Sequence, residues 1–176
     1  MKGDVEIIQA MRADLEKGLQ LLMQERWEAI YWHIRRLVVS HDDAQDATQE
    51  TFVRIFRSFH QFKGDCSLRV WMYRIATNEA LRLLGKRRTD TTSIDEASME
   101  VGQIADEAYV DYSDAEAVRL QNAILALPAK QQLVFNLRYY DELGYEEIAC
   151  ILGSSPAAAK ANYHIAKEKI IRSLSQ

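Results

Sequence analysis

The sequence contains few of the residues that specify disulfide-rich, metal-binding or β-rich proteins. Its 176 residues include two cysteines, two prolines and seven glycines. Cys66 and Cys150 lie far apart and form no Cys-x-x-Cys pair, which argues against a disulfide framework or a cysteine zinc site. Scarce proline and glycine, with frequent leucine, isoleucine, alanine, glutamine and glutamate, favour helices over a sandwich or barrel. We therefore predict an all-α fold.

Long apolar runs are also missing. No stretch approaches the roughly 20 apolar residues that span a bilayer. The N-terminal stretch MKGDVEIIQAMRADLEKG is rich in carboxylates, whereas a signal peptide would be basic and then apolar. We therefore expect a cytoplasmic protein with no membrane insertion.

The net charge of −4 hides a strongly uneven distribution of charge. Residues 63–88 contain seven Lys/Arg and two Asp/Glu, whereas residues 89–118 contain nine Asp/Glu and no Lys/Arg. This acidic stretch has no sustained helical apolar stripe, so it can bury little surface. We predict a linker at 89–115 between two small helical domains, residues 1–88 and 116–176.

In the first domain, apolar spacing predicts helices over 20–39 and 68–84, the second ending near Gly85. Between them, the stretch HDDAQDATQETFVRIFRSF predicts a helix whose first amides are capped by Asp42 or Asp43. One face of this middle helix is predicted to pack, namely Ala44, Ala47, Thr51, Ile55 and Phe59.

The second domain is expected to have four helices. Two are predicted at 119–127 and 129–140, and the stretch YEEIACILGSSP then has the length of a helix-turn-helix. Gly153 would form its turn, and Ser155 followed by Pro156 would start the last helix. Cys150 is predicted on the packed side of its helix.

The basic stretch FKGDCSLRVWMYRIATNEALRLLGKRR, residues 62–88, combines arginine and lysine with aromatic side chains and an asparagine. Cations bind phosphates, aromatic faces stack on unpaired bases, and an asparagine reads a base edge. The stretch is therefore a candidate nucleic-acid surface. Alternatively, its apolar residues fill a core and its arginines form a solvated face.

An acidic cluster comprises Asp42, Asp43, Asp46, Gln49 and Glu50. Its carboxylates spaced four residues apart, Asp42, Asp46 and Glu50, share one helix face. These side chains could bind a divalent metal. Helix capping together with a protein-binding surface is the simpler explanation of the same residues. The four histidines have no metal-ligand spacing, and no phosphate-binding glycine loop or GxSxG nucleophile motif is present. We expect no metal, no cofactor and no catalytic residue, and hence no enzyme.

Several motifs in order resemble one family. DDAQDATQETFVRIF is similar to a polymerase-binding segment, FKGDCSLRVWMYRIATNEAL to a promoter-melting segment, and LPAKQQLVFNLRYYDELGYEEIACILGSS to the start of a DNA-binding domain. Together they resemble the bacterial RNA polymerase sigma factors of the sigma-70 superfamily, in the extracytoplasmic-function (ECF) group. That resemblance implies sigma domains 2 and 4, with RNA polymerase core (clamp and flap regions), promoter DNA and an anti-sigma factor as partners.

The resemblance also implies roles for individual residues. The polymerase clamp would be contacted by Asp46, Gln49, Glu50 and Val53. Other residues would contact the minus-ten element, where one base is flipped out of the strand, together with the neighbouring strand and duplex. These residues are Phe62, Lys63, Gly64, Asp65, Ser67, Trp71, Arg74, Asn78, Arg82, Arg87 and Arg88. The minus-thirty-five element would be contacted by Ser155, Ala158, Lys160, Ala161, His164 and Lys167.

The last helix departs from the family pattern. The family commonly has a threonine, a valine and two arginines where this chain has Ala158, Ala159, Asn162 and Ile165. Each bidentate arginine contributes about 1–3 kcal/mol of base discrimination. We therefore predict an unusual recognition element that depends more on groove shape.

Three other functions are compatible with parts of the sequence. A helix-turn-helix regulator would bind duplex DNA without polymerase, typically as a dimer. A metal-dependent nuclease would use Asp42, Asp46 and Glu50. A protein-binding adaptor would use the basic helix to bind an acidic partner.

Overall fold

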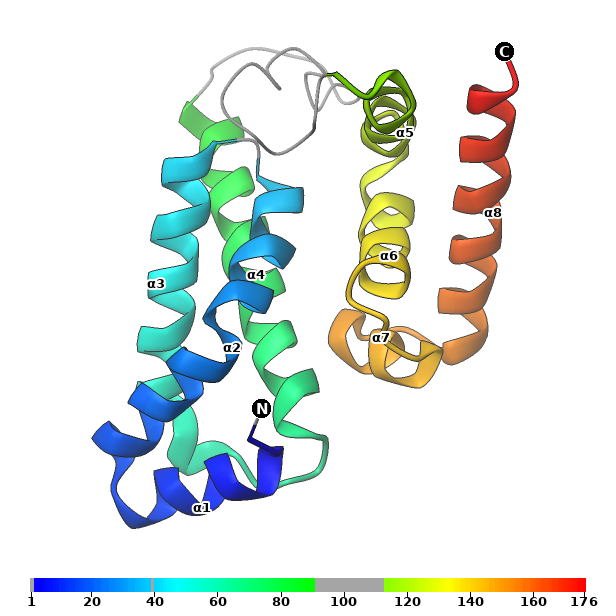
Figure 1. Ribbon diagram of the computed structural model, residues 1–176. Helices are drawn as coiled ribbons and strands as arrows, with labels where there is room; N and C mark the ends of the chain where they lie inside the picture. The colour runs from blue at the N-terminus through cyan, green and yellow to red at the C-terminus, as the bar shows by residue number, and fades with distance from the viewer. Residues whose placement is uncertain (1, 39, 91–112) are drawn as a thin grey trace. The chain divides into compact units, whose positions relative to one another are not determined.

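The computed structural model describes residues 2–38, 40–90 and 113–176, with the backbone alone for 87–90. All regular elements in these ranges are helical, which confirms the all-α prediction (Figure 1). The chain forms two compact units, residues 1–91 and 92–176. Most of the predicted linker, 89–115, lies outside the described residues. Among the described helices, none has the length and apolar character that crossing a bilayer requires.

Unit 1 is a bundle of three long helices with a shorter helix across one end. The bundle consists of α2 (Leu15–Leu37), α3 (His41–Ser58) and α4 (Leu68–Asp90), which pack against one another in pairs. A 3-10 turn, η1 (Phe59–Gln61), follows α3. The shorter helix, α1 (Asp4–Ala13), packs on α2 and reaches the start of α4 (Figure 1).

The helix boundaries in unit 1 correct several sequence predictions. Helix α1 was not predicted, and α2 begins at Leu15, five residues before the predicted start. The cap of α3 is Ser40, whose hydroxyl accepts from the Asp43 amide at 3.4 Å, so Asp42 and Asp43 are first-turn residues. Helix α4 continues through Gly85 to Asp90. Gly85 does not adopt the left-handed conformation of a helix-ending glycine.

Capping and burial explain why α2 and α3 form where they do. Asp14 accepts from the Lys17 amide at 3.2 Å at the start of α2, and this hydrogen bond lowers the pKa of the Asp14 carboxyl. The predicted packed face of α3 is confirmed, since every member is buried: Ala44, Ala47, Thr51, Ile55 and Phe59.

The core of unit 1 contains one buried polar pair. The His33 Nε2 atom on α2 lies 2.8 Å from the Thr77 hydroxyl on α4, and both residues are buried. The His33 ring also lies edge-on to Tyr73, with centroids 4.9 Å apart. Other fully buried side chains of unit 1 include Leu22, Ile30, Ile34, Ile55, Leu68 and Met72. Because both groups are buried, the hydrogen bond fixes the register of α2 on α4.

Unit 2 consists of α5 (Ala115–Leu125), α6 (Ala129–Tyr139), α7 (Tyr145–Leu152) and α8 (Pro156–Leu174). Helix α8 packs against the other three. Its apolar core includes Ala123, Ile124, Leu127, Phe135, Ala166 and Ile170. Predicted and observed helices agree here to within a few residues, apart from the start of α5, which lies at Ala115.

The helix-turn-helix geometry in unit 2 is as predicted. Gly153 has a φ of +63° and ends α7 in a left-handed conformation. Glycine adopts this conformation without the steric penalty that a Cβ atom would impose. The Ser155 hydroxyl accepts from the Ala158 amide at 3.1 Å, and Pro156 occupies the first turn of α8. The prediction for Cys150 is wrong, because this residue is exposed on α7. Ile148, Ala149 and Ile151 supply the buried face instead.

Candidate nucleic-acid and protein interfaces

The loop between η1 and α4 is anchored by one aromatic side chain and is mostly exposed. Phe62 is only 9% exposed, and its ring centroid lies 5.1 Å from that of Trp71 and 6.0 Å from that of Phe59. The exposed residues that follow it are Lys63, Gly64, Asp65 and Ser67. Phe62 therefore positions the loop through core packing, while its polar neighbours remain accessible.

Both ends of the polar part of this loop have defined local structure. Gly64 has a φ of +83°, so the chain turns there in a conformation that favours glycine. The Ser67 hydroxyl accepts from the Val70 amide at 3.2 Å and caps α4. The exposed loop is thus attached directly to the first turn of the basic helix.

One face of α4 brings together four of the predicted nucleic-acid-binding residues. Trp71, Arg74, Asn78 and Arg82 follow at intervals of three, four and four residues, which places them along one side of the helix. Trp71 and Arg74 are half-buried, and Asn78 and Arg82 are exposed. Arg87 and Arg88 belong to the last turns of α4, and their side chains lie outside the described part of the structure.

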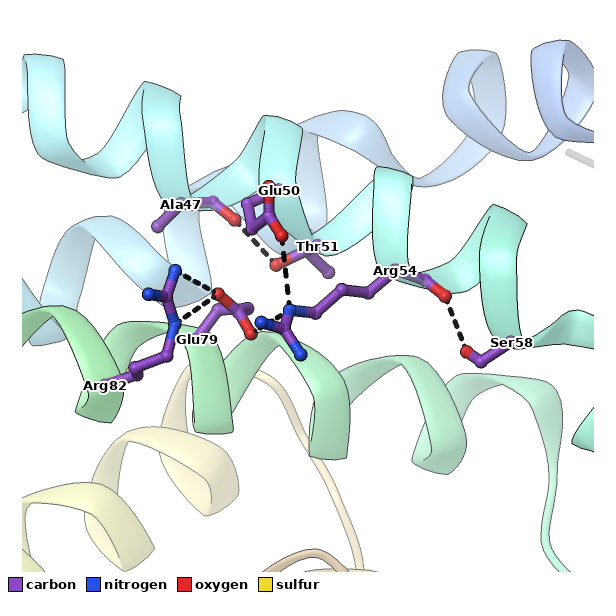
Figure 2. A network of polar contacts seen from close by, with 7 residues as sticks. All are labelled: Ala47, Glu50, Thr51, Arg54, Ser58, Glu79 and Arg82. Atoms are coloured by element: carbon purple, nitrogen blue, oxygen red, sulfur yellow. Dashed lines mark hydrogen bonds and ion pairs between the residues drawn. The ribbon is translucent and has the colours of Figure 1, made fainter.

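An ion-pair network joins this helix to α3 (Figure 2). The Glu79 carboxylate on α4 contacts both Arg82, three residues further along the helix, and Arg54 on α3. The Arg54 Nε atom also lies 3.3 Å from the Glu50 Oε1 atom. Sequence analysis did not identify Glu79 or Arg54. The available signal was a single carboxylate among the six cationic residues between Arg69 and Arg88.

The exposed face of α3 presents a mixed polar and apolar surface. Asp46 and Gln49 are exposed, Val53 is 38% exposed, and Glu50 is half-buried beside Arg54. These four residues recur at helical spacing, so they form one continuous strip. In the described residues, no three His, Cys, Asp or Glu side chains converge as metal ligands. The strip combines acidic and amide groups with the exposed side chain of Val53.

The exposed side of α8 carries the residues predicted to bind the upstream element. Lys160, Ala161, His164 and Lys167 are exposed, and Ala158 is half-buried. The Asn162 side-chain amide donates to the Ala158 carbonyl at 2.9 Å, which engages it with its own helix. Two lysines and an imidazole are thus the accessible polar groups on a face with little capacity for bidentate base contacts.

Two family models match the chain. Residues 22–89 match sigma-70 region 2 and residues 117–170 match sigma-70 region 4. The first match covers most of unit 1, including the α3 and α4 faces, and the second covers most of unit 2, including the helix-turn-helix.

Curated relatives and a solved structure extend these matches over nearly the whole chain. The RNA polymerase sigma-H factor of Pseudomonas aeruginosa is 27% identical over 97% of this chain and 93% of its own length. The ECF RNA polymerase sigma-E factor of Salmonella typhimurium is 27% identical over 95% of this chain and 92% of its own. The sigma factor RpoE of Bartonella quintana, solved in complex with the anti-sigma factor NepR, has a TM-score of 0.70 at 20% identity, covering 89% of this chain and 96% of that one.

Proposed function

The chain belongs to the sigma-70 family, with regions 2 and 4 in the arrangement of the ECF group. From this premise we propose which of its surfaces bind RNA polymerase and which bind promoter DNA during transcription initiation. As a sigma factor it directs RNA polymerase core to promoters. One observation carries this function: both regions match in order, and each falls within its own compact helical unit.

We assign the exposed strip of α3 to the polymerase clamp and the loop and face of α4 to the melted minus-ten element. The loop residues after Phe62 are exposed and tethered to the start of α4. A flipped base needs an accessible pocket beside a rigid support, and extruding it costs a few kcal/mol. Capturing that base favours the open promoter, while Asn78 and the arginines of α4 contact the separated strand.

We assign the exposed face of α8 to duplex DNA at the minus-thirty-five element. Lys160 and Lys167 would contact phosphates, and His164 would lie nearest to base edges. Small side chains at Ala158 and Ala161 allow the helix to approach thymine methyl groups closely. Binding here would position the polymerase, and the loop before α4 would then act on the downstream strand.

We further propose that an anti-sigma factor regulates the chain in the cytoplasm by covering polymerase-binding surfaces. Support comes from a solved relative that is bound to an anti-sigma factor and from the mixed apolar and acidic character of the α3 strip. A binding subunit of this kind needs no catalytic residue of its own, so we propose that it is not an enzyme.

Transcription in vitro from a promoter library, with polymerase core in the presence and absence of this chain, tests the function. We expect chain-dependent initiation at a restricted set of promoters and tight duplex binding only by the assembled holoenzyme. Tight, dimeric binding of the free chain to a palindrome, without stimulation of core polymerase, would instead establish a polymerase-independent regulator.

A further inference from the structure

Glu79 is a buried carboxylate in a helix whose charged residues are mostly cationic. Its side chain is 3% exposed and lies between α4 and α3 (Figure 2). A carboxylate in such a position is costly unless charged partners satisfy it. Its partners therefore determine whether the negative charge is retained there.

The two oxygens of Glu79 contact arginines from different helices. Oε1 contacts Arg54 of α3, and Oε2 accepts from Arg82 of α4 through Nε at 3.0 Å and Nη2 at 2.8 Å. Arg54 is also near Glu50, so the four side chains form a neutral network. Removing either arginine still leaves Glu79 with one cationic partner.

The arrangement fixes the direction of the Arg82 guanidinium. A free arginine side chain loses rotamer entropy when it is immobilised. Here two nitrogens are already bound, the side chain remains 42% exposed, and within the described residues Nη1 has no hydrogen-bond partner. Arg82 is therefore pre-oriented, with a donor still available to a phosphate.

We propose that Glu79 is a positioning residue for promoter opening, which aims Arg82 at the melted strand while Arg54 compensates its buried charge. This inference deepens the proposed function of α4 and rests on it. Because Arg54 lies on α3 beside Glu50, the orientation of Arg82 depends on the packing of the polymerase-binding helix against the DNA-binding helix.

The substitution Glu79→Gln tests the proposal in the reconstituted holoenzyme. Removing a negative charge from a basic helix raises its attraction for DNA, so binding to nonspecific duplex should stay equal or become stronger and more salt-dependent. Promoter opening, followed with a fluorescent base in the minus-ten element, should nevertheless slow about tenfold, because hydrogen bonds to charged groups contribute about 1.5–3 kcal/mol. A merely structural role would weaken both activities together.

A double-mutant cycle with Arg82→Gln decides whether Glu79 acts through Arg82. We expect Glu79→Gln to have little further effect on opening in the Arg82→Gln background, and additive losses would overturn the proposal. Arg82→Lys provides a second route, because it retains the charge and loses the two-nitrogen contact. It should slow opening about as much as Glu79→Gln, and wild-type opening by this variant would also overturn the proposal.

A matched control separates this inference from the proposed function. Glu28→Gln makes the same chemical change at an exposed position on α2 and should open promoters at the wild-type rate. If the wild-type chain does not stimulate core polymerase, the proposed function fails. If the wild-type chain and Glu28→Gln are active and Glu79→Gln opens promoters equally fast, only the positioning role fails.

Discussion

The backbone of Met11 in α1 occupies the space in which a side chain on Gly18 of α2 would lie. A Cβ atom built on Gly18 would be 2.3 Å from the Met11 Cα atom, far closer than atoms can approach. Gly18 is buried within α2, where glycine lowers helix stability by about 1 kcal/mol relative to alanine. Close packing of the two helices therefore requires a residue that is locally unfavourable.

We predict that Gly18→Ala destabilises unit 1 by about 1–3 kcal/mol, because backbone atoms of α1 would have to move. Chemical denaturation of the full chain, followed by tryptophan fluorescence, measures the change. Gly85→Ala is the matched control, since no atom lies within 4 Å of its added Cβ. That variant should stabilise α4 by about 0.5–1 kcal/mol. Equal effects of the two substitutions would show that α1 does not pack closely on α2.

Gly153 and Gly85 show that the same local sequence signal can have different structural outcomes. A glycine near the end of an apolar pattern predicts a helix end, and at Gly153 the left-handed conformation confirms that reading. Gly85 has the same local signal, but α4 continues through it. Helix α1 was missed because only Ile7 and Met11 of its residues are buried, so its apolar pattern was too short to detect.

Asp4 joins α1 to both α2 and the beginning of α4. Its Oδ1 accepts from the Arg26 guanidinium at 2.9 Å, and its Oδ2 accepts from the Arg69 amide at 3.4 Å. We predict that Asp4→Asn weakens these contacts by about 1–2 kcal/mol and loosens the adjoining loop. Hydrogen exchange at residues 63–70 should become faster. Glu6→Gln, at an exposed position in the same helix, should leave exchange unchanged, and similar acceleration by both variants would contradict the role of Asp4.

The candidate surfaces could be predicted better than their internal contacts. Helical spacing was sufficient to place Asp42, Asp46 and Glu50 on one face, because a helix repeats every 3.6 residues. The family resemblance then added Gln49 and Val53 to that surface. The pairing of Glu79 with Arg54 could not be predicted, since the two residues lie on different helices whose relative register depends on the whole core. Similarly, only the structure revealed that Asn162 bonds to its own backbone.

We predict that Lys160→Gln weakens upstream duplex binding almost equally for all sequences. A phosphate contact carries no base information, so the slope of log K against log salt should become shallower by about 1. Binding of the holoenzyme to a set of minus-thirty-five variants, at several salt concentrations, measures both quantities.

We predict the opposite behaviour for His164→Ala, which should change the ranking of those sequences. An imidazole that contacts a base edge makes one hydrogen bond, which contributes about 0.5–1.5 kcal/mol at one base pair. The same binding series measures the ranking, and Lys160→Gln serves as its comparison. An unchanged ranking for His164→Ala would show that His164 does not read a base edge.

Helix α6 carries a polar side chain at a core position. Asn136 is 1% exposed, and within the described residues neither its amide nitrogen nor its amide oxygen has a hydrogen-bond partner. A buried amide without a partner costs about 1–3 kcal/mol, whereas an apolar side chain of the same shape at that position carries no such penalty. We therefore predict that Asn136→Leu stabilises unit 2 by about 1–2 kcal/mol, measured as slower hydrogen exchange of the α6 amides. Asn122→Leu, at an exposed position on α5, should change stability by less than about 0.5 kcal/mol. A loss of stability in Asn136→Leu would contradict the prediction and would mean that the amide forms a hydrogen bond in solution.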